Sequence, residues 1–201
     1  MIVYFDLETG GLDANLHPII QLAAVVVSPE GNLLADWETK IAFDPATADP
    51  QALEVNHYAP LEWVDAPSEA TALATFTTWL RHYADVEKVS PRNGRKYSVA
   101  QLAGHNAGSF DMPFLKAACK RNGLFLPANP FALDTLQLAY AIDLAAGRRR
   151  ESYRLESLCE DYQVPIGRAH DALADVRATA ALGAKLLAEL RGSPSTAPAG
   201  H

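Results

Sequence analysis

Two acidic residues with one position between them follow an apolar run at the start of the chain. The stretch FDLETGGLD places Asp6 and Glu8 just after residues 2–5, IVYF. Successive side chains of a strand alternate between its faces, so Asp6 and Glu8 should emerge on one side, roughly 6.5 to 7 Å apart. Two such carboxylates repel each other unless a cation lies between them. The alternative is a solvated strand end whose carboxylates accept hydrogen bonds from loop amides, and this stretch alone does not separate the two.

A second stretch brings polar and acidic residues to another expected junction. AGHNAGSFDMPFL places His105 and Asn106 at the end of an expected strand and Asp111 at the start of an expected helix. An aspartate at a helix start commonly caps the amides of the first turn, which is the alternative for Asp111. His105 is expected to be structural rather than catalytic.

A third stretch opens the last expected helix. RAHDALADVRATA carries His170 and, five residues later, Asp175. Ideal helical geometry separates such a pair by about 140 degrees, so they converge only if His170 lies on the entering loop. The alternative is that Asp171 caps the helix while His170 and Asp175 are solvated.

The three stretches together predict a metal site. Four carboxylates and one histidine at the ends of elements suit hard, oxygen-coordinated ions such as Mg²⁺ or Mn²⁺ better than zinc, which prefers nitrogen and sulfur. Two such ions, ~3.5 to 4 Å apart, can hold both the attacking and the leaving oxygen of a phosphodiester displacement.

The apolar pattern predicts an α/β fold. Strands are expected at 2–5, 19–28, 33–43, 99–106 and 131–135, and helices at 68–83, 110–122, 135–146, 153–162 and 170–190. Residues 85–98 are charged and contain Pro and Asn-Gly, so we expect an exposed loop there. This order of elements indicates a mixed sheet covered by helices on both faces.

Composition limits the class of protein. The formal charge of -7 disfavours binding of nucleic acid through overall basicity, although local basic patches remain possible. Cys119 and Cys159 lie far apart, as expected of reduced, buried thiols. With no secretory or membrane-spanning pattern, a cytoplasmic protein is expected. We expect one domain over residues 1–191 and a disordered tail over 192–201, which is small, polar and contains proline.

The three stretches, in their order, resemble the motifs of the DEDDh group of 3′–5′ exonucleases, the DnaQ-like family that includes polymerase proofreading exonucleases. FDLETGGLD is similar to its first motif, HNAGSFD to its second and HDALAD to its third. The resemblance implies an RNase H-like fold with a mixed five-stranded sheet. One departure is that residues 107–109 separate the Asn from the aromatic-Asp pair, where many members have two residues and some have three.

The resemblance also implies roles for five residues. Asp6, Glu8, Asp111 and Asp175 would be the metal-associated acids, and His170 the histidine that names the subgroup. By this resemblance Asp6, Glu8 and Asp175 hold one ion, while Asp6 and a water held by Asp111 position a second. His170 would act as general base on the attacking water, a task that suits an unperturbed pKa near ~6.5.

Residues that could recognise a chain end lie beside the first two motifs. Around Thr9 to Leu12, Gly10 and Gly11 would permit close approach of a terminal sugar, and Leu12 could wedge against the last base. The alternative is an ordinary glycine turn with Leu12 in the core. Asn106 could bind a phosphate or only a loop amide.

Aromatic and basic residues offer weaker signals for nucleic-acid binding. Phe110, Tyr58 and Trp63 could stack on bases, although Trp63 is first expected in the core. Basic residues cluster at 148–154 and at 92–96, where they could hold a phosphate backbone or could simply be solvated.

The favoured hypothesis is a metal-dependent 3′–5′ exonuclease that releases nucleoside 5′-monophosphates from single-stranded or frayed DNA, with two Mg²⁺ or Mn²⁺ ions. Its partner would be a nucleic-acid 3′ end, DNA rather than RNA, and a polymerase or repair complex could hold it. The alternatives are an oligoribonuclease-like RNA trimmer, a non-catalytic module that binds nucleic-acid ends, and a phosphatase-like hydrolase of small nucleotides. The sequence carries no signal for oligomeric state.

Overall fold

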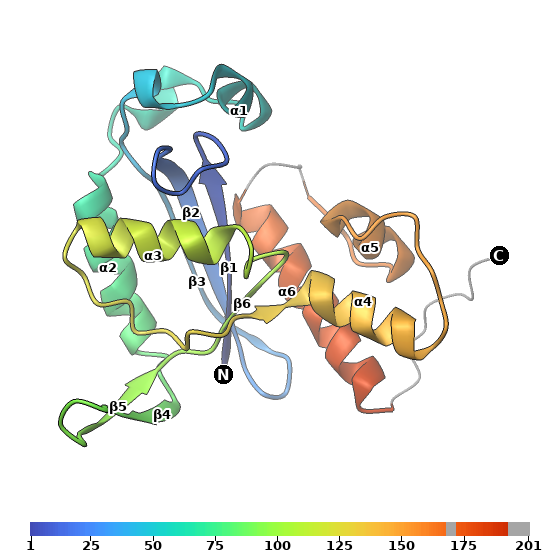
Figure 1. Ribbon diagram of the computed structural model, residues 1–201. Helices are drawn as coiled ribbons and strands as arrows, with labels where there is room; N and C mark the ends of the chain where they lie inside the picture. The colour runs from blue at the N-terminus through green and yellow to red at the C-terminus, as the bar shows by residue number, and fades with distance from the viewer. Residues whose placement is uncertain (168–171, 193–201) are drawn as a thin grey trace.

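A mixed five-stranded sheet forms the centre of the protein, as the computed structural model in Figure 1 shows. The structure describes residues 1–167 and 172–192. The strand order is β3-β2-β1-β6-β7. β1 (Ile2–Thr9), β2 (Ile19–Val27) and β3 (Leu33–Lys40) pair antiparallel, whereas β6 (Leu102–Gly104) runs parallel to β1 and β7 (Leu133–Asp134) parallel to β6. The predicted mixed sheet is therefore confirmed.

Helices cover both faces of this sheet, also as predicted (Figure 1). α2 (Glu69–Arg81) and α3 (Asp111–Arg121) share one core with the sheet. α6 (Ala172–Leu190) crosses the other face over β1 and β2, and α4 (Thr135–Ala145) and α5 (Leu155–Asp161) pack against α6. The short α1 (Pro50–Val55) and the 3₁₀ turns η1 (Pro45–Thr47) and η2 (Pro60–Trp63) precede α2.

Alternation along β1 determines which way its acidic residues face. Val3, Phe5 and Leu7 join the core under α2 and α3, whereas Tyr4 joins the core under α6. Side chains two positions apart share a face, so Asp6 and Glu8 continue the face of Tyr4 and turn towards α6. The period-2 argument from the sequence therefore holds in the structure.

The expected loop at 85–98 is the main error in the predicted elements. It contains a separate two-stranded hairpin of β4 (Val86–Val89) and β5 (Lys96–Val99). Gly94 takes a φ of 69° in its turn, as the Asn-Gly signal allows. Most of the hairpin's side chains are exposed, so its strands lack the apolar alternation that sequence analysis depends on. The other predicted elements differ from the structure only at their ends, whereas α1, η1 and η2 were not predicted.

A buried carboxylate anchors the segment that follows α4. The Asp143 side chain is fully buried and accepts hydrogen bonds from Arg148 Nε at 2.7 Å, from Arg150 Nε and from the Tyr153 hydroxyl at 3.2 Å. Burial alone raises the pKa of Asp143, but the hydrogen bonds from Arg150 and Arg148 outweigh it and leave that pKa below its ordinary value. Arg150 also pairs with Asp161, so the segment 146–154 is tied to α4 and α5.

None of the helices within the described residues combines the length and apolar character that crossing a membrane requires.

We expect Asp143→Asn to lower the free energy of unfolding by about 3 kcal/mol, since it removes a buried charge and turns an amide N–H₂ towards two guanidinium groups. Because the folded pKa of Asp143 is lowered, its contribution is present above the unfolded carboxyl pKa and is lost as the pH falls through the folded pKa. Urea unfolding at neutral pH measures the loss. Asp161→Asn is the matched control, since it removes the half-exposed partner of the same Arg150 and should cost under ~1 kcal/mol. Equal losses in the two variants would contradict the prediction.

Candidate active site

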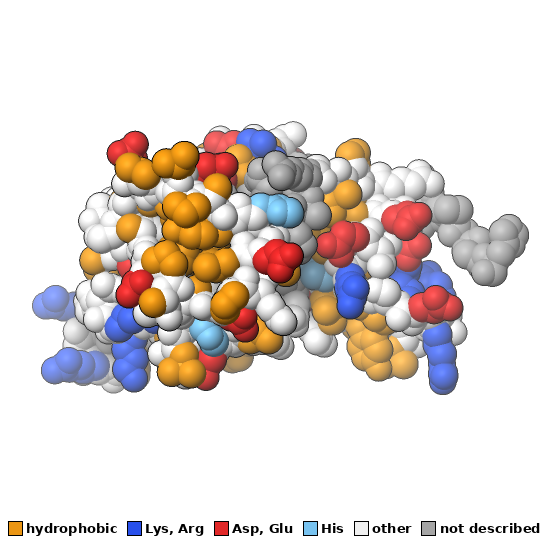
Figure 2. All heavy atoms as spheres, turned by 90° about the horizontal axis from the view of Figure 1, so that it is seen from above, with side chains coloured by type: hydrophobic (Ala, Val, Ile, Leu, Met, Phe, Trp, Pro, Cys, Tyr) orange, Lys and Arg blue, Asp and Glu red, His pale blue; other side chains and the backbone are white. Residues whose placement is uncertain are grey.

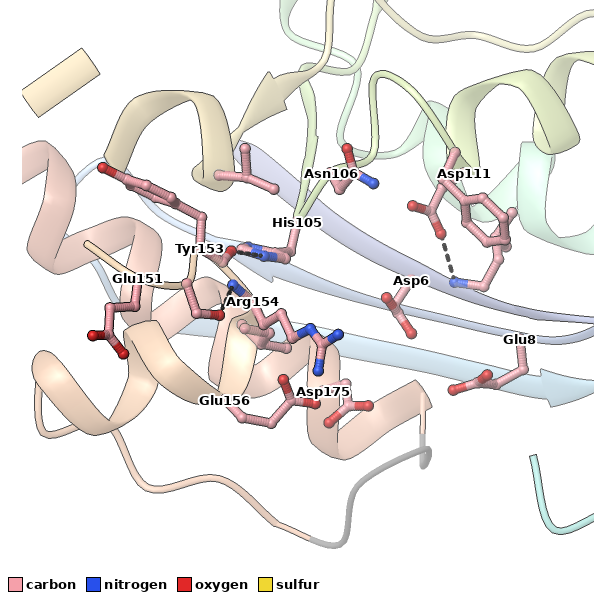
Figure 3. A pocket seen from close by; sticks show the side chains of 15 residues that line it. Asp6, Glu8, His105, Asn106, Asp111, Glu151, Tyr153, Arg154, Glu156 and Asp175 are labelled. Atoms are coloured by element: carbon pink, nitrogen blue, oxygen red, sulfur yellow. Dashed lines mark hydrogen bonds between the residues drawn. The ribbon is translucent and has the colours of Figure 1, made fainter. Parts of the chain in front are cut away.

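Three of the predicted acids meet at the end of β1. One carboxylate oxygen each from Asp6, Glu8 and Asp175 lie within 4.8 Å of one another. Asp6 and Glu8 come from the last residues of β1, and Asp175 comes from the first turn of α6. A carboxylate near the start of a helix is stabilised by the helix dipole, which favours Asp175 at this position. Figure 3 shows the three side chains around one hollow.

Asp111 reaches the same hollow from α3. Its side chain is only 3% exposed, and the Leu7 backbone N–H donates a 3.0 Å hydrogen bond to Asp111 Oδ1 (Figure 3). The helix begins at Asp111, and Phe110, its N-cap, makes no side-chain capping bond. The reading of Asp111 as a cap of its own helix is therefore wrong. Its carboxylate instead ties the start of α3 to the backbone of β1 between Asp6 and Glu8.

Burial and mutual repulsion make these acids reluctant to ionise together. Burial is the main cause that raises the pKa of Asp6, followed by the charges of Asp111 and Asp175. Burial also raises the pKa of Asp111 to about 7, against the lowering effect of the Leu7 amide. An all-oxygen set of crowded carboxylates is the donor set that hard divalent cations prefer. The residues therefore fit a Mg²⁺ or Mn²⁺ site.

The second acidic stretch is held in place by Asp134, a residue that sequence analysis did not single out. Asp134 Oδ1 accepts from the Asn106 N–H at 3.0 Å and Oδ2 accepts from the Gly108 N–H at 3.2 Å, while Oδ1 also caps α4 through the Leu136 N–H. Asn106 takes a left-handed φ of 56°, and its side chain lines the hollow (Figure 3). An Asp at the strand-to-helix junction of FALDT was the available signal for this residue.

His105 is engaged on both sides of its ring. Nδ1 lies 2.9 Å from Thr135 Oγ1, and Nε2 lies 3.0 Å from the Tyr153 carbonyl oxygen. Burial is the main cause that lowers the pKa of His105, which favours the neutral ring. These contacts make His105 a link between β6, α4 and the segment before α5.

Packing within the protein requires glycine at two positions of the loop after β1. A Cβ on Gly11 would lie 2.5 Å from the His17 ring, and a Cβ on Gly10 would lie 2.9 Å from Pro18. The Thr9 hydroxyl donates to the Gly11 carbonyl at 2.7 Å and closes the turn. Leu12 is 86% exposed, so the alternative that placed it in the core is wrong. Figure 2 shows the face that carries this loop, where hydrophobic side chains gather.

The hollow is an open cavity of about 650 Å³. Besides the four acids it is lined by Asn106, His105, Phe110 and Leu136 on one side and by residues 151–156 on the other. The predicted acids Asp6, Glu8, Asp111 and Asp175 thus converge, and Asn106 and Phe110 join them. The wall at 151–156 was not predicted as part of the site. His170 and Asp171 lie outside the described residues.

Several residues proposed for nucleic-acid contact have other positions. Trp63 is 9% exposed and donates from Nε1 to the Ile20 carbonyl at 3.1 Å, as expected of a core anchor. Arg148 and Arg150 form ion pairs with the buried Asp143. The basic residues at 92–96 lie in the hairpin of β4 and β5. This hairpin is near the start of β1, because the N-terminal ammonium pairs with Asp85, just before β4. The acids of the site lie at the other end of β1.

Comparisons with known proteins agree with this geometry. The model of the Exonuclease family (RNase_T) matches residues 3–91 and 95–182. The DNA polymerase III PolC-type of Latilactobacillus sakei subsp. sakei (strain 23K) is 33% identical over 185 residues, which are 92% of this chain and 11% of that protein. The PolC-type polymerase of Bacillus cereus (strain ATCC 14579) is 28% identical over 188 residues, 94% of this chain and 11% of the polymerase. The chain thus spans about a tenth of the length of these relatives.

Solved structures share the fold. A structure of exonuclease I has a TM-score of 0.72 at 22% identity and covers 94% of this chain and 40% of its own. E. coli exonuclease I in complex with a dT13 oligonucleotide has a TM-score of 0.70 at 22% identity and covers 94% and 41%. The expected RNase H-like fold and the resemblance to DEDDh exonucleases are confirmed. Since the matched residues contain all three acidic stretches, the chain belongs to the Exonuclease family.

Proposed function

We propose that this protein is a metal-dependent 3′–5′ exonuclease that acts on single-stranded or frayed DNA and releases nucleoside 5′-monophosphates. The observation that carries the proposal is the convergence of Asp6, Glu8 and Asp175 within 4.8 Å, with Asp111 beside them in one open cavity. Membership of the Exonuclease family supports the reaction class. The openness of the cavity suits a polymer end, which must enter with its chain trailing into solvent.

The roles of the chain's own residues follow from their positions. Two bound Mg²⁺ or Mn²⁺ ions would neutralise the scissile phosphate and lower the pKa of a water nucleophile. Asp6, Glu8 and Asp175 would hold these cations. Asp111, which is fixed by the Leu7 amide, would help to position a cation near the leaving 3′ oxygen. His170 is proposed as general base by the resemblance alone, because it lies outside the described residues.

DNA is the proposed polymer and a replication or repair assembly the proposed setting. The relatives that align over most of this chain are DNA polymerases of PolC type, and E. coli exonuclease I has been solved with dT13 and dA16 oligonucleotides. Both observations concern those proteins, and they favour DNA over RNA here.

The exposed Leu12 and the fixed turn of Thr9 to Gly11 are proposed to engage the terminal nucleotide. A leucine that is 86% exposed on a turn held by the Thr9 hydroxyl is available for contact with a base without rearrangement. Phe110 and Asn106, which line the same cavity as Asp175, are proposed to contact the terminal base and a phosphate.

Asp6→Asn should lower the rate by ~10³-fold or more, because it removes a shared cation ligand and with it the stabilisation of transition-state charge. The assay follows 5′-labelled single-stranded DNA and RNA in Mg²⁺, Mn²⁺ or EDTA. Wild type should give a metal-dependent ladder that shortens from the 3′ end, faster on DNA. In EDTA the variant should melt at or above the wild-type temperature, because it relieves repulsion with Asp111 and Asp175. Glu160→Gln, at an exposed acid of α5, is the control and should remain active. Full activity of Asp6→Asn would contradict the assignment of Asp6 as a catalytic metal ligand.

Cation binding should weaken as the pH falls, by roughly tenfold per pH unit where one proton is displaced. The pKa of Asp111 is raised to about 7 and that of Asp6 is also raised, so the metal-free site holds protons that a cation must expel. The same raised pKa values make the stability of the metal-free protein depend on pH. The contribution of these two acids is fully present below the ordinary carboxyl pKa, where they are protonated, and it is lost as the pH rises through about 7. Thermal shifts with Mn²⁺ on either side of neutrality measure both effects. A cation affinity that does not change with pH in this range would contradict the prediction.

Leu12→Ala should leave the melting temperature unchanged and slow removal of nucleotides from a base-paired end by roughly tenfold, in keeping with the energy of one base contact. A single-stranded substrate should be affected less, since its end needs no fraying. Leu16→Ala is the matched control, because Leu16 lies in the same loop and is 71% exposed. The role assigned to Leu12 would be contradicted if Leu12→Ala and Leu16→Ala slowed the removal of nucleotides from a base-paired end equally, and likewise from a single-stranded end.

A further inference from the structure

The charge around the cavity is distributed unevenly. Its described lining includes six acidic residues, namely Asp6, Glu8, Asp111, Glu151, Glu156 and Asp175, and a single Lys or Arg residue, Arg154. Figure 3 shows the guanidinium group of Arg154 extending into the cavity towards Asp175 and Asp6. Arg154 precedes α5, so it comes from the wall opposite the strand β6 and the second motif.

Unlike Arg148 and Arg150, Arg154 has no side-chain partner among the residues that the structure describes. Arg148 pairs with Asp143 and Glu189, and Arg150 pairs with Asp143 and Asp161. Within residues 1–167 and 172–192, the Arg154 side chain makes neither an ion pair nor a hydrogen bond. Two arginines of this basic run therefore stabilise the fold, while Arg154 keeps its donors available for a ligand.

The backbone that carries Arg154 is nevertheless held on both sides. The preceding Tyr153 carbonyl lies 3.0 Å from His105 Nε2, and the Tyr153 hydroxyl donates to Asp143. Arg154 itself is the N-cap of α5, and its carbonyl accepts from the Leu158 N–H at 3.0 Å. Because this backbone is already fixed, binding of a ligand by Arg154 orders only its side chain and not the segment that carries it.

The chemistry of a guanidinium group in this place points to one kind of ligand. Its planar fork matches two oxygens of a phosphate and forms charge-assisted hydrogen bonds with them. Cations held by the acids would neutralise part of the charge of a bound phosphate. The guanidinium of Arg154, which extends towards Asp6 and Asp175, would contact further phosphate oxygens and oppose repulsion by Glu151 and Glu156 (Figure 3).

We propose that Arg154 is a substrate-binding residue that contacts the scissile phosphate, and hence the phosphate group of the nucleoside 5′-monophosphate formed from it. The proposal rests on the proposed exonuclease function and adds a specific phosphate contact to it. Arg154 makes its contact with the anionic group common to substrate and product, so the effect of its removal is seen in binding as well as in turnover.

The test compares Arg154→Ala with wild type, using thymidine 5′-monophosphate and thymidine as calorimetric ligands at saturating Mg²⁺. Loss of the guanidinium should weaken binding of the monophosphate by roughly 10- to 100-fold and leave binding of the nucleoside unchanged. Arg154→Lys should recover only part of the affinity, because an ammonium group lacks the fork. Arg149→Ala is the matched control, since Arg149 is an arginine of the same run that makes no ion pair among the described residues. All variants should melt as wild type does.

A parallel time course on single-stranded DNA separates this proposal from the function on which it rests. If wild type shortens no oligonucleotide, the exonuclease proposal fails. If wild type is active and Arg154→Ala matches it in kcat/KM and in monophosphate affinity, the function stands and the role of Arg154 is overturned. The role is also overturned if higher Mg²⁺ restores the variant fully, because Arg154 would then act on the cation site and not on the phosphate.

Discussion

Repulsion among carboxylates at one point is the constraint on which the rest of this structure depends. Asp6, Glu8 and Asp175 bring oxygens within 4.8 Å of one another, and Asp111 adds a fourth acid that is almost fully buried. In water these groups would separate, so the fold must hold them against their charges. β1 can do so because β2 and β6 bond both of its edges and helices cover both of its faces. A divalent cation bound among these carboxylates would offset their repulsion.

The surrounding polar groups hold the site by contacts with the backbone. Asp134 holds the amides of Asn106 and Gly108, His105 reaches the carbonyl of Tyr153, and Asp143 gathers the segment 146–154. The contacts of Asp134 and His105 join segments distant in sequence, whereas those of Asp143 tie α4 to the segment that directly follows it. The cavity therefore has walls that are ordered without a ligand, which lowers the entropic cost of binding one.

Local periodicity accounts for what the sequence predicted well. Asp6 and Glu8 could be placed on one face because a strand has a period of two. The helix expected at 68–83 is α2, which Ser68 caps by accepting from the Thr71 N–H. Asp111 could not be settled in this way, since a helix-starting aspartate looks the same whether it caps its own helix or accepts from a strand 104 residues away. Asp134 was missed for a related reason, because the amides that it holds, those of Asn106 and Gly108, come from another element. Arg154 was noted only within the basic run 148–154, because its place in the cavity depends on how distant segments pack. The hairpin of β4 and β5 was missed because exposed strands carry no apolar alternation.

The net charge of the chain and the local charges at its site affect the binding of a polyanion in different ways. A formal charge of -7 repels a polyanion at long range, and the acids of the site add to that repulsion. For such a protein to act on nucleic acid, attraction must arise locally. Its proposed sources are cations bound by the same acids, exposed apolar side chains such as Leu12, and the guanidinium of Arg154, which has no partner among the described residues. An acidic surface with these few local exceptions would hold a chain end in the cavity while binding the rest of the strand weakly. Selectivity for ends would then follow from the distribution of charge as much as from the shape of the turn after β1.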